Sequence, residues 1–253
     1  MKKILFLICF IGLYSGLYGQ DKKIAPKKEP VKNDLVPLRK CIIEGQANAI
    51  LYNQNLKDHS KEHDVNSIIL DIEKYIDSLH RIRTLSDQLL MKYFMPLRHF
   101  FLTTTNKTSV ATFFLYANTP YQFCQYNDSA TALYIGAVKD GSLYNLGKMT
   151  EKKIVRSSFE NCLLPSLKAL DEFKDAETKY IALSVYYGCK DTREGAPAGL
   201  SVSYCLTFVA RTTDLQQYAS GLITIKGLLA NSEIYLSDEE SYNDIRKIQI
   251  VVE

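Results

Sequence analysis

Two histidines and a glutamate near the start of the chain have the spacing of a zinc site. The stretch Asp58–Asp64 is DHSKEHD, so His59 and His63 are four residues apart and Glu62 precedes the second histidine. On a helix, side chains four residues apart lie on one face and can bind the same metal ion. In the pattern H-x-x-E-H the histidines hold zinc and the glutamate is the general base. The stretch is therefore a candidate site for metal-dependent peptide hydrolysis.

The surroundings of this motif favour a solvent-exposed helix start instead. Asp58, Lys61 and Asp64 are charged, whereas a catalytic helix of this kind would have apolar flanks. Acidic side chains at a helix N-terminus interact favourably with the helix dipole and need no metal. The sequence contains no CxxC spacing, glycine-rich phosphate loop or G-x-S-x-G element. We therefore expect no cofactor and lean towards a non-catalytic protein, with zinc as the alternative.

The segment at 179–211 predicts a β-hairpin. Residues 181–189 and 200–208 both alternate between apolar and small or polar side chains, as strands with one buried face do. Gly195, Pro197 and Gly199 lie between them and favour a turn. If both apolar faces meet one core, odd-numbered residues of the first strand pair with even-numbered residues of the second. A shift by one residue would expose one apolar face, so this register is favoured.

The hairpin register constrains the cysteines. Five cysteines follow residue 19, and an odd number leaves at least one without an intramolecular partner. Cys189 falls on the core face and Cys205 on the opposite face, which disfavours a bond between them. Cys162 belongs to a helical stripe that should pack on the face with Cys189. The candidate disulfide is thus Cys162–Cys189, and the alternative is that these cysteines are small buried apolar residues.

The most regular helical pattern in the chain covers residues 65–93. Its apolar residues recur in alternating steps of three and four, Asp64 can cap its start and Pro96 marks its end region. The repeat persists for about four heptads, near the lower limit for a coiled coil. The stripe therefore packs inside the protein or pairs with another helix. If a protein partner or a second copy of the chain binds, we expect it to do so through the helix at 65–93 or through a sheet edge.

The second half of the chain has the pattern of strands with one further helix. Strands are predicted at 131–138, 221–226, 233–236 and 245–252, with a turn at Asp140–Gly141. A helix is predicted at 157–174, with a capping box of Ser157 and Glu160 and an irregularity at Pro165. The predicted class is α+β: a helical N-terminal part with a long amphipathic helix, and a mainly antiparallel sheet in the C-terminal part with one helix packed on it.

The N-terminus has the pattern of an export signal. Lys2 and Lys3 precede an apolar run at 4–13 that is too short to span a membrane, and small residues follow up to Gly19. We predict cleavage before Gln20, with an uncleaved anchor as the alternative. The predicted organisation is a signal peptide at 1–19, a basic tether rich in proline and lysine at 20–37, a helical region at 38–107 and an α+β domain at 108–253.

The distribution of charge argues against nucleic-acid binding. Residues 21–40 carry seven basic and three acidic side chains, a net charge of +4, and the chain as a whole carries +3. With Lys2 and Lys3 counted, residues 41–253 have a net charge of −3, whereas a nucleic-acid-binding domain needs a basic face. We expect an exported protein of the periplasm or cell exterior, without a transmembrane span after signal removal. Its expected role is non-catalytic partner binding, and the alternative is an exported hydrolase that uses the HSKEH stretch.

Overall fold

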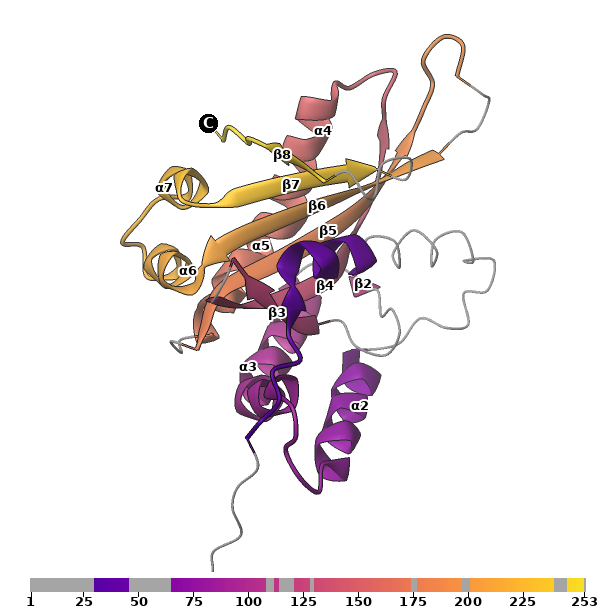
Figure 1. The fold of residues 1–253 in the computed structure, drawn as a ribbon. Helices are drawn as coiled ribbons and strands as arrows, with labels where there is room; N and C mark the ends of the chain where they lie inside the picture. The colour runs from indigo at the N-terminus through magenta and orange to yellow at the C-terminus, as the bar shows by residue number, and fades with distance from the viewer. Residues whose placement is uncertain are drawn as a thin grey trace, which may run out of the picture. The chain divides into compact units, whose positions relative to one another are not determined.

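The computed structural model describes residues 30–45, 65–107, 112–113, 121–127, 130–173, 177–196, 201–238 and 245–252. From Val31 onward the chain forms one compact unit with α+β architecture (Figure 1). The predicted signal peptide and the HSKEH stretch lie outside the described residues. Within the described ranges, no helix combines the length and apolar character that a membrane crossing requires.

Eight described strands form one mixed sheet. The sheet order is β1, β3, β4, β5, β6, β7, β8, and β2 pairs separately with β4. The bounds are β1 Val36–Pro37, β2 Thr112–Phe113, β3 Tyr121–Tyr126, β4 Ala130–Asn145, β5 Thr178–Lys190, β6 Ser201–Arg211, β7 Glu233–Asp238 and β8 Arg246–Ile248. The pairs β1–β3 and β4–β5 are parallel and the others are antiparallel. A parallel pair needs a long crossover connection, and helical segments provide it between β4 and β5.

The hairpin of β5 and β6 has the predicted register. Odd-numbered residues of β5 pair with even-numbered residues of β6, so Cys189 is opposite Val202 and Tyr186 is opposite Cys205. The face of the hairpin that carries Cys189 packs into the larger apolar core. The prediction that Cys189 and Cys205 lie on opposite faces is confirmed.

The crossover helix begins earlier than predicted and changes pitch along its length. It consists of α4 (Glu151–Ser158), the π-helical η2 (Phe159–Leu163), α5 (Leu164–Leu167) and the 3-10 segment η3 (Lys168–Glu172). Thr150, rather than Ser157, caps the start, because its hydroxyl accepts a backbone N–H three residues later. Pro165 has no N–H and is unfavourable inside an α-helix. The π turn precedes it, and the Leu164 N–H donates to the carbonyl of Phe159.

The predicted long helix at 65–93 is wrong, because the chain forms two helices there. They are α2 (Val65–Ser78) and α3 (Leu85–Lys107). Thr84 caps α3: its Oγ1 accepts the N–H of Asp87 at 3.1 Å. The hydroxyl of Tyr75 on α2 donates to Asp87 Oδ1 at 2.7 Å and joins the two helices.

The turn between these helices also attaches the N-terminal part of the fold. The Lys32 N–H donates to the carbonyl of Arg83 and the Leu85 N–H donates to the carbonyl of Lys32, each at 2.9 Å. Together with β1, these bonds bring residues 32–37 into the fold, although the sequence pattern assigned them to the tether.

Three other segments depart from the predicted strands and ends. β4 continues through Asp140 and Gly141, with irregular register on either side of them, and does not turn. Pro96 lies inside α3 and does not end it. The strand expected at 221–226 is a turn that leads into a helix. This part of the chain forms α6 (Thr212–Ala219) and α7 (Ile225–Ala230) between β6 and β7.

Helices cover both faces of the sheet (Figure 1). On the back face, the apolar side chains of β4, β5 and β6 pack against α3 and the crossover helix. On the front face, a helix at 38–45 packs on β3, β4, β5 and β6. The front core contains Leu38, Cys41, Ile42, Cys124, Ala132, Tyr134, Ala182, Val209 and Ile245. Side chains from the predicted helical region at 38–107 and from the strands therefore contribute to both cores.

Candidate functional site

A pocket of 560 Å³ opens on the front face of the sheet, beside the helix at 38–45 and the ends of β3 and β7. Its walls combine aliphatic side chains with two tyrosines, two amides, an arginine and a glutamate. The lining residues are Pro37, Leu38, Arg39, Ile42, Gln125, Tyr126, Asn127, Glu233, Tyr235 and Ile245. Segments that are distant in the sequence thus form one concave surface with a few polar groups, as small-molecule sites do.

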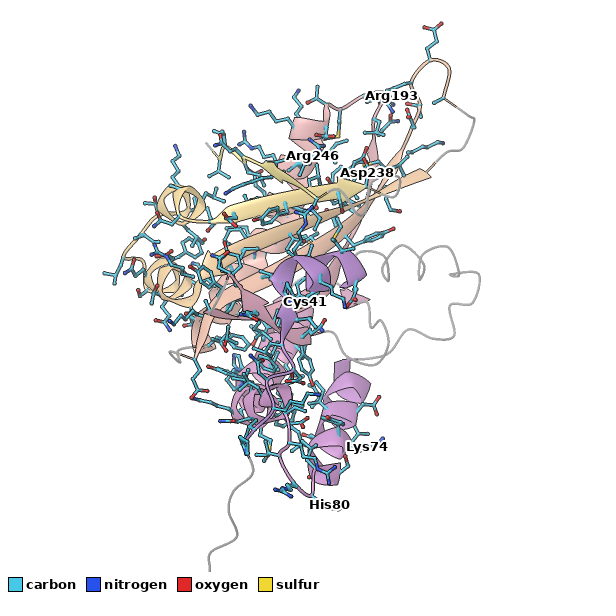
Figure 2. The ribbon with its side chains drawn as sticks, viewed as in Figure 1. Cys41, Lys74, His80, Arg193, Asp238 and Arg246 are labelled. Atoms are coloured by element: carbon cyan, nitrogen blue, oxygen red, sulfur yellow. A yellow bond between two sulfur atoms is a disulfide. The ribbon has the colours of Figure 1, made fainter. Side chains whose placement is uncertain are left out.

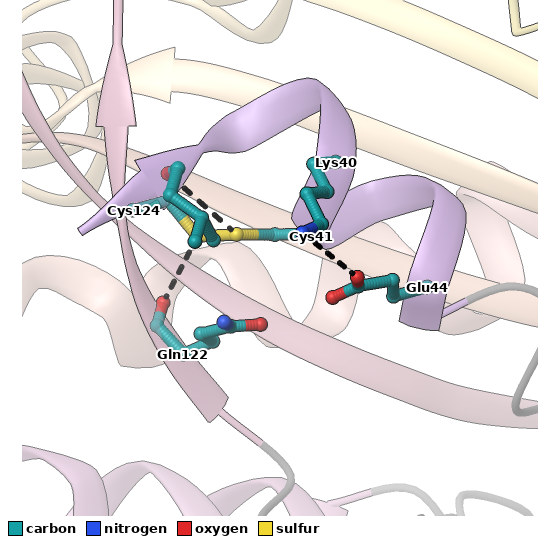
Figure 3. The surroundings of a disulfide bond; sticks show 6 residues. Lys40, Cys41, Glu44, Gln122 and Cys124 are labelled. Carbon is teal, nitrogen blue, oxygen red and sulfur yellow. Dashed lines mark hydrogen bonds and ion pairs between the residues drawn. A yellow bond between two sulfur atoms is a disulfide. The ribbon is translucent and has the colours of Figure 1, made fainter. Parts of the chain in front are cut away.

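A disulfide between Cys41 and Cys124 holds the helical wall of this pocket against the sheet. Their Cα atoms are 6.9 Å apart, and 83 residues separate them in the sequence. Figure 3 shows the bond joining the helix at 38–45 to β3. Lys40 and Glu44 form an ion pair of 3.6 Å on the exposed side of the same helix. Leu38 and Ile42 are buried beside the disulfide, so the helix has one apolar face and that face is fixed to the sheet.

The predicted disulfide between Cys162 and Cys189 is wrong. Both are buried free thiols, and Cys205 is a third. Cys162 does lie on the crossover helix that packs against β5, as the sequence pattern indicated. The two thiols act there as small apolar contacts in the back core. Cys41 finds its partner because its helix crosses the front face, which the periodicity of the chain did not indicate.

Glu233 is the central polar group of the pocket. Its Oε2 accepts the hydroxyl of Tyr126 at 2.7 Å and the hydroxyl of Tyr235 at 2.5 Å. Its Oε1 accepts Lys247 Nζ at 2.7 Å. Three donors from β3, β7 and β8 therefore converge on one carboxylate. The ring of Tyr180 packs against that of Tyr126, with 4.2 Å between the centroids, and supports it from β5.

Burial and these hydrogen bonds fix the protonation states of Glu233, Tyr126 and Tyr235. Burial alone would raise the pKa of Glu233, but the hydrogen bonds from Lys247, Tyr235 and Tyr126 outweigh it and the pKa is lowered. Burial and the hydrogen bond to Glu233 raise the pKa of both tyrosine hydroxyls. At neutral pH the glutamate is thus an anion and the tyrosines are neutral. A carboxyl group with a lowered pKa is a poor proton acceptor near pH 7, and a hydroxyl with a raised pKa is a poor proton donor. The cluster is therefore better suited to holding a ligand than to proton transfer.

Arg39 supplies a positive charge at the edge of the pocket. Its side chain is exposed, and it is close enough to Tyr235 to lower the pKa of that hydroxyl against the larger effect of burial. Among the described residues, the Arg39 guanidinium forms no hydrogen bond or ion pair. A guanidinium can bind a carboxylate or phosphate through two parallel hydrogen bonds. Arg39 is therefore the group in the pocket best placed to bind an anion.

The back core contains ionisable groups without a catalytic arrangement. Burial and the charge of Asp140 raise the pKa of the Cys162 thiol to about 12. Burial, Glu151 and Asp140 raise that of Cys189 to about 12 as well. Asp140 itself accepts the hydroxyl of Tyr144 at 2.7 Å. A nucleophilic cysteine needs a lowered pKa, so these thiols are structural.

The zinc candidates His59, Glu62 and His63 lie outside the described residues. In the part of the chain that the structure describes, no group of three or more histidine, cysteine, aspartate or glutamate side chains is arranged to hold a metal ion.

The residues that form the pocket were not identified from the sequence. Glu233 and Tyr235 share one face of β7 because they are two residues apart, a signal visible in the alternation of that strand. Tyr126 is 107 residues from Glu233, and β3 and β7 are not neighbours in the sheet, so only the tertiary fold brings the two side chains together. Comparison with protein-family models, with curated proteins and with solved structures finds no match to this chain.

Proposed function

We propose that this is an exported protein that binds a ligand or partner in the front-face pocket without transforming it. The observation that carries the proposal is the Glu233 cluster. Its carboxylate accepts three donors and its tyrosines are held neutral, so the pocket offers fixed dipoles and apolar walls instead of a group ready for proton transfer. Arg39 selects for a ligand with an anionic group beside an apolar body.

Two features support export. The pattern at 1–19 is that of a signal peptide. The Cys41–Cys124 disulfide belongs to an oxidising compartment, since disulfides form and persist in secreted and periplasmic proteins. Mass determination of the protein recovered after export is expected to give a chain that begins at Gln20.

A role for the apolar stripe at 65–93 in partner binding is less well supported. Ile72 on α2 and Leu89 and Tyr93 on α3 are buried in the protein's own back core. These three stripe residues are thus occupied within the chain, whereas Tyr75 and Ile82 of the same stripe are exposed. The pocket, in contrast, is concave and open.

Site-specific photo-crosslinking in the native envelope tests the proposal. A photoreactive side chain replaces Pro37, which is exposed on the edge of the pocket. A matched control replaces Gln217, which is exposed on α6 and does not line the pocket. We expect an adduct of defined mass from position 37 that is lost when Arg39→Ala is added, and no such adduct from position 217.

Two outcomes would overturn the proposal. Equal adducts from both positions, unaffected by Arg39→Ala, would show that the pocket is not the site. Stoichiometric zinc in the purified mature protein, lost in the His59→Ala/His63→Ala variant, would instead favour a metal-dependent hydrolase.

A further inference from the structure

Residues 249–252 follow β8 and belong to no described strand. Side-chain burial alternates along this segment: Ile248, Ile250 and Val252 pack towards the back core, whereas Gln249 and Val251 face solvent. Val251 is 62% exposed, although valine is usually buried. Alternation with a period of two is typical of a strand. The sequence predicted a strand over 245–252, but the structure forms one only at Arg246–Ile248.

The backbone of residues 249–252 lies outside the β7–β8 pairing. The pairing of β7 with β8 ends at Ile234 and Ile248. It goes no further because β7 begins at Glu233 and the chain before it forms helix α7. Among the described residues, none of Gln249 to Val252 forms a backbone hydrogen bond. β8 is also the last strand in the sheet order. Unpaired N–H and C=O groups at a sheet edge are a template for another strand.

Residues 248–251 line two cavities. The first, of 510 Å³, is bounded by the start of α4 and residues 248–251. The second, of 480 Å³, is bounded by α7, Lys247 and residues 248–252. In β-strand addition the backbone gives affinity and pockets for alternate side chains give specificity. Both elements are present here.

The surroundings of the edge are positively charged. Lys152 and Lys153 on α4 and Lys226 on α7 line the two cavities. Within the described ranges, none of these three lysines forms an ion pair. Two carboxylates near the edge are paired among the described residues: Glu151 binds Arg246 at 2.6 Å, and Glu233 binds Lys247 at 2.7 Å. Figure 2 labels Arg246 on β8. An incoming strand therefore meets three uncompensated cations.

We infer that the edge formed by β8 and residues 249–252 binds an extended acidic segment of a partner protein as an additional strand. A second copy of this chain fits poorly, because it would bring the same lysines to the contact. The N-terminal stretch at 21–40, with a net charge of +4, would be repelled for the same reason. An acidic strand with alternating side chains would pair with the free backbone groups, place side chains in the cavities and neutralise the lysines.

Binding of model peptides tests this inference. The probe is a fluorescein-labelled, end-blocked ten-residue peptide that alternates glutamate and valine. The control peptides are its lysine–valine counterpart and a glutamate–valine peptide interrupted by Pro-Gly. We expect only the uninterrupted acidic peptide to raise the fluorescence anisotropy, and we expect it to slow amide hydrogen exchange at 249–251. Equal binding of the lysine peptide, or no added protection at 249–251, would overturn the inference.

A pair of charge-reversal variants separates the edge from a general charge effect. Lys152→Glu/Lys153→Glu is expected to weaken binding of the acidic peptide by about tenfold or more. Lys168→Glu/Lys179→Glu makes the same change of net charge at exposed lysines on η3 and at the start of β5, and should leave binding within about twofold. Equal weakening by both variants would contradict the proposed site. A concentration-dependent dimer in light scattering that the peptide does not dissociate would assign the edge to a second copy.

Discussion

The hydroxyl of Tyr126 on β3 donates to Oε2 of Glu233 on β7 over 2.7 Å, although 107 residues separate them in the sequence. The same oxygen accepts the hydroxyl of Tyr235. This junction lies where the front face of the sheet is hollowed into the pocket. It links the first half of the sheet to its C-terminal edge, so it should contribute to stability as well as to binding.

Replacing Glu233 by glutamine is expected to destabilise the fold by about 1–2 kcal/mol at pH 7, because hydrogen bonds to a charged acceptor become bonds to a neutral one. The measurement is urea unfolding followed by circular dichroism. Glu44→Gln is the matched control, since among the described residues Glu44 forms just an exposed ion pair with Lys40. That change should stay within about 0.5 kcal/mol, and an equal effect of both variants would refute a special role for Glu233.

The contribution of Glu233 should disappear in acid. Its folded-state pKa lies below the ordinary value of 4.5, so the folded protein binds this proton less readily than the unfolded chain does. The stabilisation is therefore present above the unfolded pKa and is lost as the pH falls through the folded pKa. The difference in unfolding free energy between wild type and Glu233→Gln should be full at pH 7 and should shrink below about pH 4.5. A difference that grows in acid would contradict this assignment.

The β5–β6 hairpin could be predicted because its information is local. Alternation fixes the face of every residue, and a register shift would expose a whole apolar face. That reasoning placed Cys189 and Cys205 on opposite faces without any knowledge of the fold. The same alternation predicted the strand at 233–236 and placed Ile248, Ile250 and Val252 on one inward face.

Features that depend on tertiary contacts could not be predicted in this way. The stripe at 65–93 continues in the sequence across the turn at 79–84, because both α2 and α3 pack on one core. The interruption has a signal in Thr84 and Asp87, which are spaced as an N-cap and the residue whose backbone N–H it accepts. The Cys41–Cys124 disulfide and the front pocket depend on the helix at 38–45 crossing the sheet, and no spacing along the chain records that.

Thiol counting tests the disulfide directly. For the chain that begins at Gln20, denatured without reductant, alkylation is expected to modify three thiols, and with reductant five. Peptide mapping should place the protected pair at Cys41 and Cys124. Five modified thiols without reductant would show that this bond is absent from the protein.

Removing the disulfide should destabilise the protein strongly. The bond closes a loop of 83 residues, and a cross-link of that length is expected to contribute about 3–5 kcal/mol, mainly by restricting the unfolded chain. The Cys41→Ser/Cys124→Ser variant is compared with wild type by urea unfolding, with and without dithiothreitol. Reductant should destabilise wild type and leave the variant unchanged. Equal sensitivity of both proteins to reductant would assign the effect to another bond.

Gly45 tests how closely the helix at 38–45 approaches the sheet. A Cβ atom at this position would lie 2.2 Å from the hydroxyl oxygen of Tyr134, and Tyr134 is buried in the front core and cannot move aside freely. Gly45→Ala is therefore expected to destabilise the fold by about 1–3 kcal/mol through overpacking, despite the better helix propensity of alanine.

Gly227→Ala on α7 is the matched control for this substitution. Its added Cβ would be 3.5 Å from the nearest atom, an ordinary contact, so the change should stabilise the protein by about 0.4–1 kcal/mol through the lower backbone entropy of the unfolded chain. Urea unfolding of the two variants beside wild type gives opposite signs if the helix lies as described. A stabilising effect of Gly45→Ala would mean that this end of the helix is farther from Tyr134, and that the wall of the pocket is more open than in the structure.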